Sequence, residues 1–172
     1  MDKAFLFFTV IALCFAVPCR QPAQGNKVID EINAAKVRAR TFVEEAERKR
    51  TQAKQSSNPG DQETLIEEAA QLYGQASDAL NEAVKNANEM TKVKSPAWYK
   101  EYFSLQSKFI DNLSQLASGA RAELFVRKNG PPTDSQLQSW TANIDRIRKQ
   151  NEEYRSQISA IEARQGVKLI TE

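Results

Sequence analysis

The segment from Thr133 to Gln165 repeats its large apolar residues at alternating steps of three and four. The residues in this pattern are Leu137, Trp140, Ile144, Ile147, Tyr154, Ile158 and Ile161. Asn151 fills the position between Ile147 and Tyr154. Such a spacing places two residues of every seven on one face of an α-helix, and that face requires a partner helix. The rest of the chain must therefore supply further amphipathic helices.

Three other segments carry matching apolar patterns. Residues 27–54 and 62–92 have seams rich in alanine, whereas residues 96–128 carry a broad aromatic and aliphatic face. An alanine stripe accepts bulky side chains from a neighbouring helix, so the two kinds of face are complementary. Turn-forming residues at 56–60 and 129–132 separate the segments, because they cannot continue a helix.

Four helices of about 30 residues joined by short turns favour antiparallel neighbours. The sequence therefore predicts an all-α fold, an antiparallel up-down-up-down four-helix bundle over residues 26–166, followed by a C-terminal tail at 167–172. An alternative architecture also buries these apolar faces, in which the helices form two long hairpins that associate with a second chain. We therefore expect a monomer or a homodimer.

Several residues predict where the helices begin and end. Asp61 and Ser95 are suited to N-cap the second and third helices. Thr133 and Gln136 form a capping-box pattern at the start of the fourth helix. Gly166 is suited to its C-terminal end.

Residues 1–25 predict a secretory signal peptide and a short N-terminal segment. Ala4–Val17 is an uncharged run of fourteen residues, which is shorter than the about twenty that a membrane-spanning helix needs. Cleavage after Ala16 would leave Cys19 as a lone thiol, and cleavage after Gly25 would leave no cysteine. We expect a secreted, extracellular protein without a transmembrane span.

Histidine is absent from the sequence. This removes the commonest general base, the commonest metal ligand and the usual activator of a nucleophile. We therefore expect no enzyme, no catalytic residue, no cofactor and no metal site. The net charge is only +2 and its charges are interspersed, so nucleic acid is not an expected partner. The basic run Arg146–Lys149 is predicted to be a solvated helix edge.

Four aromatic residues open the third helix: Trp98, Tyr99, Tyr102 and Phe103. They cannot all face inward, because Tyr99 and Phe103 lie on a different flank of the helix from Trp98 and Tyr102. The pattern predicts that one flank is exposed or covers a pocket. These four residues are candidates for interaction or ligand contact.

Asn151 is the polar group at the centre of the last seam. A buried asparagine often fixes the register of packed helices, and it can also contact a ligand inside a bundle. Tyr154, one step along the seam, can supply its hydrogen-bond partner. Both residues are candidate contacts. Asn112 begins a glycosylation sequon, but it lies mid-helix beside the seam, a poor place for an acceptor.

The leading functional hypothesis is a secreted, non-enzymatic helical bundle that binds an extracellular macromolecule, such as another protein. A second hypothesis is a carrier of lipid or another apolar small molecule. In its amphipathic helices without internal disulfides, the chain resembles exchangeable apolipoproteins in outline. A third hypothesis is a structural coiled-coil component of an extracellular assembly.

Overall fold

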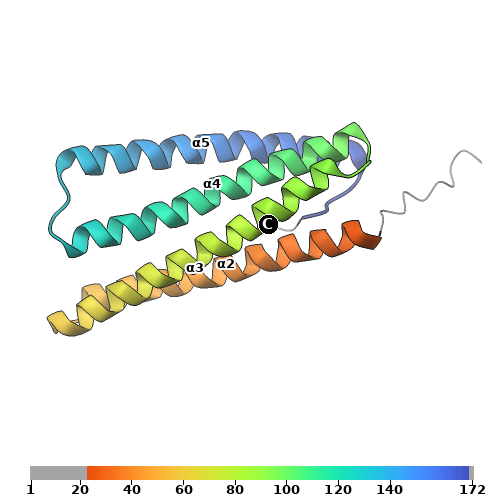
Figure 1. The fold of residues 1–172 in the computed structure, drawn as a ribbon. Helices are drawn as coiled ribbons and strands as arrows, with labels where there is room; N and C mark the ends of the chain where they lie inside the picture. Colours follow the sequence, from red (N-terminus) through yellow and green to blue (C-terminus); the bar gives the residue numbers. More distant parts are fainter. Residues whose placement is uncertain (1–22, 171–172) are drawn as a thin grey trace, which may run out of the picture.

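The computed structural model describes residues 23–170, and these form four long helices (Figure 1). They are α2 (Ala23–Gln55), α3 (Pro59–Lys92), α4 (Ala97–Lys128) and α5 (Asp134–Gln165). The prediction of an all-α, up-down-up-down four-helix bundle is confirmed. No helix in this part of the chain is long and apolar enough to cross a bilayer. Of the predicted N-terminal features, residues 1–22, with Ala16 and Cys19, lie outside the described residues.

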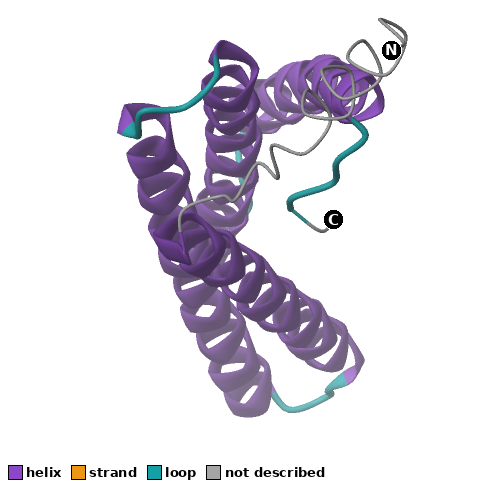
Figure 2. Ribbon diagram, turned by 90° about the vertical axis from the view of Figure 1, so that its right-hand side faces the viewer, coloured by secondary structure: helices purple, strands orange, loops and turns teal. Residues whose placement is uncertain are grey.

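Consecutive helices pack against one another in antiparallel pairs. The contacts of α3 with α2 and with α4 are extensive, and those between α4 and α5 are fewer. The two edge helices, α2 and α5, do not pack along their lengths, and Figure 2 shows them as separate rods. The bundle is therefore open along the edge between its first and last helices.

The core joins small residues of α2 and α3 to large residues of α4, as the alanine-rich seams predict. Ala35 of α2 and Ala83 of α3 are fully buried, and so are Tyr102, Phe103 and Ile110 of α4. Burying one large apolar side chain stabilises a fold by about 1.5–3 kcal/mol. The α2–α3–α4 contacts therefore hold most of the core.

The helix α5, which carries the clearest heptad seam, contributes least to this core. Its buried residues are Ile147, Ile158 and Ile161. Leu137 at its start is 38% exposed, and Trp140 is only half-buried. The physical reason is that, within residues 23–170, α4 alone packs along α5, so the seam has no second partner helix there.

The starts of α3 and α4 differ from their predicted caps. Asn58, not Asp61, caps α3, and its side chain accepts a hydrogen bond of 2.9 Å from the Gly60 backbone nitrogen. Pro59 occupies the first turn, where its missing N–H costs nothing, so the helix starts earlier. Helix α4 has Pro96 rather than Ser95 at its N-cap and lacks a side-chain cap.

Both predicted ends of α5 are confirmed. Thr133 and Gln136 form the capping box, in which each side chain accepts a hydrogen bond from the backbone of the other residue. Gly166 follows the helix with a φ of 62°, the left-handed conformation that glycine adopts at little cost.

The tail after α5 folds back between α5 and α2 (Figure 2). The Ile170 backbone nitrogen donates a hydrogen bond of 3.2 Å to the Tyr102 hydroxyl of α4. The Asn33 side chain of α2 donates one of 3.5 Å to the Leu169 carbonyl. Ile170 itself is only 2% exposed. The tail therefore closes the end of the open edge at which α4 begins.

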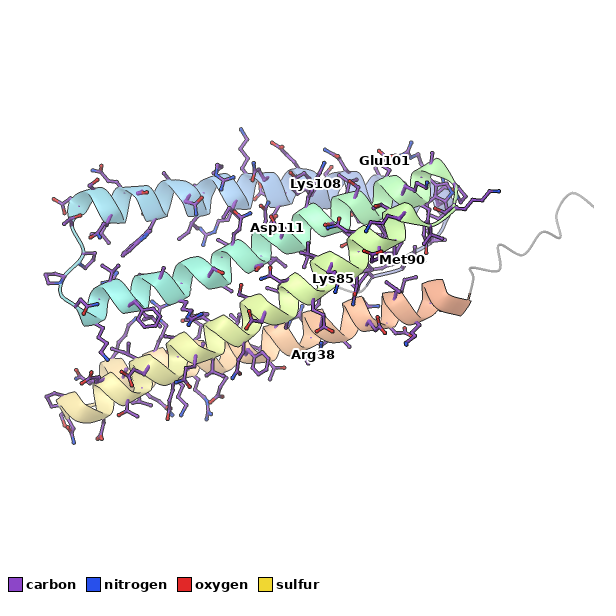
Figure 3. The ribbon with its side chains drawn as sticks, in the orientation of Figure 1. Arg38, Lys85, Met90, Glu101, Lys108 and Asp111 are labelled. Carbon is purple, nitrogen blue, oxygen red and sulfur yellow. The ribbon has the colours of Figure 1, made fainter. Side chains whose placement is uncertain are left out.

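Charged side chains cover the outer faces of the helices. Figure 3 labels Arg38, Lys85, Glu101 and Lys108, all of which are exposed, whereas the labelled Met90 is buried. Arg38 pairs with Glu82 at 2.7 Å and so links α2 to α3. Exposed ion pairs of this kind contribute at most about 1 kcal/mol each, so the core determines stability.

Gly74, in the middle of α3, packs against an arginine. A β-carbon at this position would lie 3.2 Å from the Nη1 atom of Arg121 in α4. The two helices therefore pack closely at Gly74, where the guanidinium of Arg121 fills the space.

Candidate functional site

The open edge of the bundle forms a groove of about 720 Å³. Its two sides come from α2 and α5, and its floor comes mainly from α4 with a smaller part from α3. Small-molecule sites in proteins commonly enclose about 300–1,000 Å³. The groove is therefore large enough for a small organic ligand.

The floor of the groove is apolar. The α4 residues that form it are Phe109, Leu113, Leu116, Ala117 and Ala120. They follow the helical spacing of one α4 face, which is why a single face meets the groove along its length. Val37 of α2 lies at the rim and is 62% exposed. Apolar surface therefore remains accessible to a ligand along this edge.

Basic side chains line both sides of the groove. Lys36 and Arg40 come from α2, and Arg148 and Arg155 come from α5. Among the described residues, Arg40, Arg148 and Arg155 make no ion pair. The groove thus carries positive charge that the residues described around it do not neutralise.

The two sides come together over Phe109. The Lys36 ammonium lies 6.0 Å from the ring centroid, and the Arg155 guanidinium lies 5.9 Å from it. A cation over an aromatic face is attracted by about 0.5–1 kcal/mol at exposed sites. Beyond this point the remaining hollow is only about 20 Å³, and Ile170 of the tail lines it. Phe109 therefore marks the closed end of the groove.

The opposite end of the groove carries acidic and hydroxyl groups. Glu44 and Glu47 of α2 lie there together with Tyr73 of α3. The Tyr73 hydroxyl donates a hydrogen bond to Glu47 and accepts one of 3.2 Å from Arg50. Burial raises the pKa of Tyr73 to about 12, so this hydroxyl keeps its proton near neutral pH. This network fixes the Glu47 carboxylate beside Tyr73.

The aromatic cluster at the start of α4 belongs to the core. Tyr99 is 5% exposed, Tyr102 and Phe103 are fully buried, and Trp98 is half-buried. The prediction that one flank is exposed is therefore wrong, because the flank of Tyr99 and Phe103 is buried and the other flank exposes only part of Trp98. The reason is that α4 packs between α3 and α5, and the tail forms a hydrogen bond with the Tyr102 hydroxyl at this end of the bundle. Only Trp98 keeps some exposed surface for a partner.

Asn151 bonds to a residue that was not its predicted partner. Its side-chain oxygen accepts a hydrogen bond of 2.9 Å from the Asn112 side chain of α4. Tyr154 instead packs, half-buried, against the core. The Asn112–Asn151 pair links α4 to α5 at one register, which favours the structural role of Asn151. Neither Asn151 nor Tyr154 lines the groove.

The sequence patterns did not identify the groove. Phe109 and Leu113 have the spacing of ordinary core residues, and Arg148 falls in a basic run predicted to be a solvated edge. The basic residues become a site only because α2 and α5 leave the bundle open between them. The sequence offered one indication of an open edge. The last helix carries an apolar stripe along its whole length, and such a stripe stays partly exposed where it has only one partner helix.

No group of histidine, cysteine and acidic residues in the described part of the chain could hold a metal ion. No protein-family model, no curated protein and no solved structure matches this chain. The site must therefore be interpreted from its own geometry.

Proposed function

We propose that this protein is a non-enzymatic carrier that holds an apolar or amphiphilic small molecule in the groove between α2 and α5. The observation that carries this proposal is the groove itself, about 720 Å³ over an apolar floor of α4 residues. This proposal is the second hypothesis of the sequence analysis, a carrier of an apolar small molecule. The proposed ligand site is now the groove, not the aromatic cluster at the start of α4. We place this activity outside the cell, in keeping with the predicted signal peptide.

The energetics of burial favour an alkyl ligand. Each buried methylene contributes about 0.8 kcal/mol, so a chain with ten buried methylenes gains about 8 kcal/mol. Immobilising the chain and the loss of translational freedom offset part of this gain. A gain of about 8 kcal/mol alone corresponds to a dissociation constant of about 1 μM, so these costs place the expected constant above this value.

The size of the groove also bears on the macromolecular hypothesis. The groove is open along one side, so its volume does not exclude part of a helix from another protein. Binding of an extracellular protein therefore stays a prediction.

The test uses N-phenyl-1-naphthylamine, an uncharged dye whose fluorescence rises in apolar sites. We expect saturable binding to the full chain. Ala120 lines the groove, so the Ala120→Phe variant should fill part of it and weaken binding by at least about tenfold.

Ala122→Phe is the matched control, because Ala122 is exposed on the same helix and does not line the groove. It should bind the dye as the unmodified protein does. Absence of binding, or equal binding by the Ala120→Phe and Ala122→Phe variants, would contradict the proposal.

A further inference from the structure

We infer that the ligand is a single-chain anion whose headgroup is held by Arg40, Arg148 and Arg155, with its chain directed toward Tyr73. This inference rests on the proposed carrier function and adds to it the chemical class and the orientation of the ligand.

The charge of the groove changes along its length. Along α2 the groove extends from Lys36 to Glu47, a distance of about 16 Å at the rise of an α-helix. Lys36, Arg40 and Arg155 lie toward the Phe109 end, and the acidic residues Glu44 and Glu47 lie toward the Tyr73 end. Arg148 lies two turns of α5 from Arg155 and is therefore near the middle of the groove. An anionic headgroup is therefore favoured near Phe109 and repelled near Tyr73.

The three arginines are available to an anion. Arg40, Arg148 and Arg155 are exposed and make no ion pair within residues 23–170. A guanidinium presents a planar set of donors that matches a carboxylate or phosphate. Because Arg40 and the two α5 arginines lie on opposite sides of the groove, a headgroup between them would be contacted from both edges.

The floor suits the chain of such a ligand. From Phe109 toward Tyr73 it continues through Leu113, Leu116 and Ala120 and offers only apolar side chains. Ile170 and the tail block the other direction. A chain whose headgroup lies among the arginines can therefore extend only toward Tyr73.

The experiment compares ligands with the same twelve-carbon chain as competitors of N-phenyl-1-naphthylamine, at concentrations below micelle formation. The ligands are dodecanoate, dodecyl phosphate, dodecan-1-ol and dodecyltrimethylammonium. We expect the anions to bind at least about tenfold more tightly than the alcohol, and the cation to bind most weakly. The tighter of the two anions identifies a carboxylate or a phosphate as the preferred headgroup.

The triple variant Arg40→Gln, Arg148→Gln, Arg155→Gln should bind dodecanoate and dodecan-1-ol with similar affinity. Arg146→Gln is the control, because Arg146 is exposed on α5 but does not line the groove. It should keep the preference for anions. Circular dichroism and dye binding establish that each variant is folded.

The possible failures are distinguishable. If dodecan-1-ol binds as tightly as dodecanoate, or if the triple variant keeps its preference for anions, the inference about the headgroup is wrong and the carrier function stands. If the unmodified protein binds neither the dye nor any of the four ligands, the carrier function and the inference are both wrong.

Discussion

The side chain of Asn112 in α4 donates a hydrogen bond of 2.9 Å to the side-chain oxygen of Asn151 in α5. Asn112 is 5% exposed, so its amide depends on this partner rather than on water. The other contacts between α4 and α5 are few compared with those of α3. Apolar contacts allow one helix to shift along another, whereas a hydrogen bond requires one relative position. The pair therefore fixes the position of α5, and with it the position of Arg148 and Arg155 beside the groove.

Replacing Asn112 by alanine should destabilise the fold. The substitution removes a buried hydrogen bond, and we expect the free energy of unfolding to fall by about 1–2 kcal/mol in urea denaturation. Asn88→Ala is the control, since Asn88 is exposed on α3 and should lose nothing. Equal stability of Asn112→Ala and the unmodified protein would contradict a structural role for the pair.

Because Asn112 is buried, we also expect it to carry no glycan. The intact mass of the protein after secretion from eukaryotic cells should show no added glycan at Asn112.

Removing the Tyr102 hydroxyl should loosen the tail. This hydroxyl donates to Glu162 at 2.9 Å and accepts hydrogen bonds from Gln106 and the Ile170 backbone nitrogen, both at 3.2 Å. Tyr102→Phe leaves two buried donors without an acceptor, so we expect a loss of about 1–3 kcal/mol. Trypsin should also cleave faster after Lys168.

The control for the tail experiment is Tyr154→Phe, because Tyr154 is half-buried on α5 and no hydrogen bond of its hydroxyl is present among the described residues. Its stability and its cleavage rate should stay close to those of the unmodified protein. If Tyr102→Phe also leaves both unchanged, the Tyr102 hydroxyl does not hold the tail.

Stability should fall at alkaline pH. Burial raises the pKa of Tyr73 from 10.0 to about 12 in the folded protein. Between these values the folded state keeps the proton and the unfolded chain loses it, so the free energy of unfolding decreases as pH rises. The slope is up to about 1.4 kcal/mol per pH unit for one such group.

Tyr73→Phe should reduce this alkaline slope, which urea denaturation at pH values from about 9 to about 12 can measure. Lysine titration affects both proteins equally, so the difference between their slopes isolates Tyr73. Tyr102 has its pKa raised to about 12 mainly by burial, and it should contribute a residual slope in the variant. Identical slopes in the two proteins would show that Tyr73 is not protected from solvent.

Gly74→Ala should be neutral or stabilising. Alanine is favoured over glycine within a helix by about 1 kcal/mol. The new β-carbon would lie 3.2 Å from Nη1 of Arg121, but this is the far end of an exposed, flexible side chain that can move. Gly119→Ala, which meets nothing within 4 Å, should show the full gain. If the urea concentration at the midpoint of unfolding is clearly lower for Gly74→Ala than for the unmodified protein, the side chain of Arg121 does not move aside.

Much of the fold was predictable from sequence because it depends on local patterns. The spacing of apolar residues placed the four helices, the complement between alanine and aromatic faces predicted the core, and Thr133 with Gln136 predicted a helix start. The polar position of Asn151 in an apolar seam predicted a specific contact. Its partner Asn112 was not predicted, because that pairing depends on the register between two helices.

The groove was not predictable for a different reason. A helical seam shows that a face needs a partner, but it does not show how many partners the fold provides. Phe109 and Leu113 would be core residues if α2 and α5 packed together, and they line a groove because those helices do not. The aromatic cluster shows the converse, because the sequence predicted that one of its flanks is exposed or covers a pocket, whereas Tyr99, Tyr102 and Phe103 are buried in the core.

The most direct test of the central claim is a nuclear magnetic resonance titration of the labelled full chain with dodecanoate. We predict that the largest chemical-shift changes occur at the methyl groups of Leu113, Leu116, Ala117 and Ala120, which form the groove floor. Phe125 and Leu137 are exposed apolar residues outside the groove and should change little. Changes centred on Phe125 and Leu137, with none along the groove floor, would contradict the assignment of the groove as the binding site.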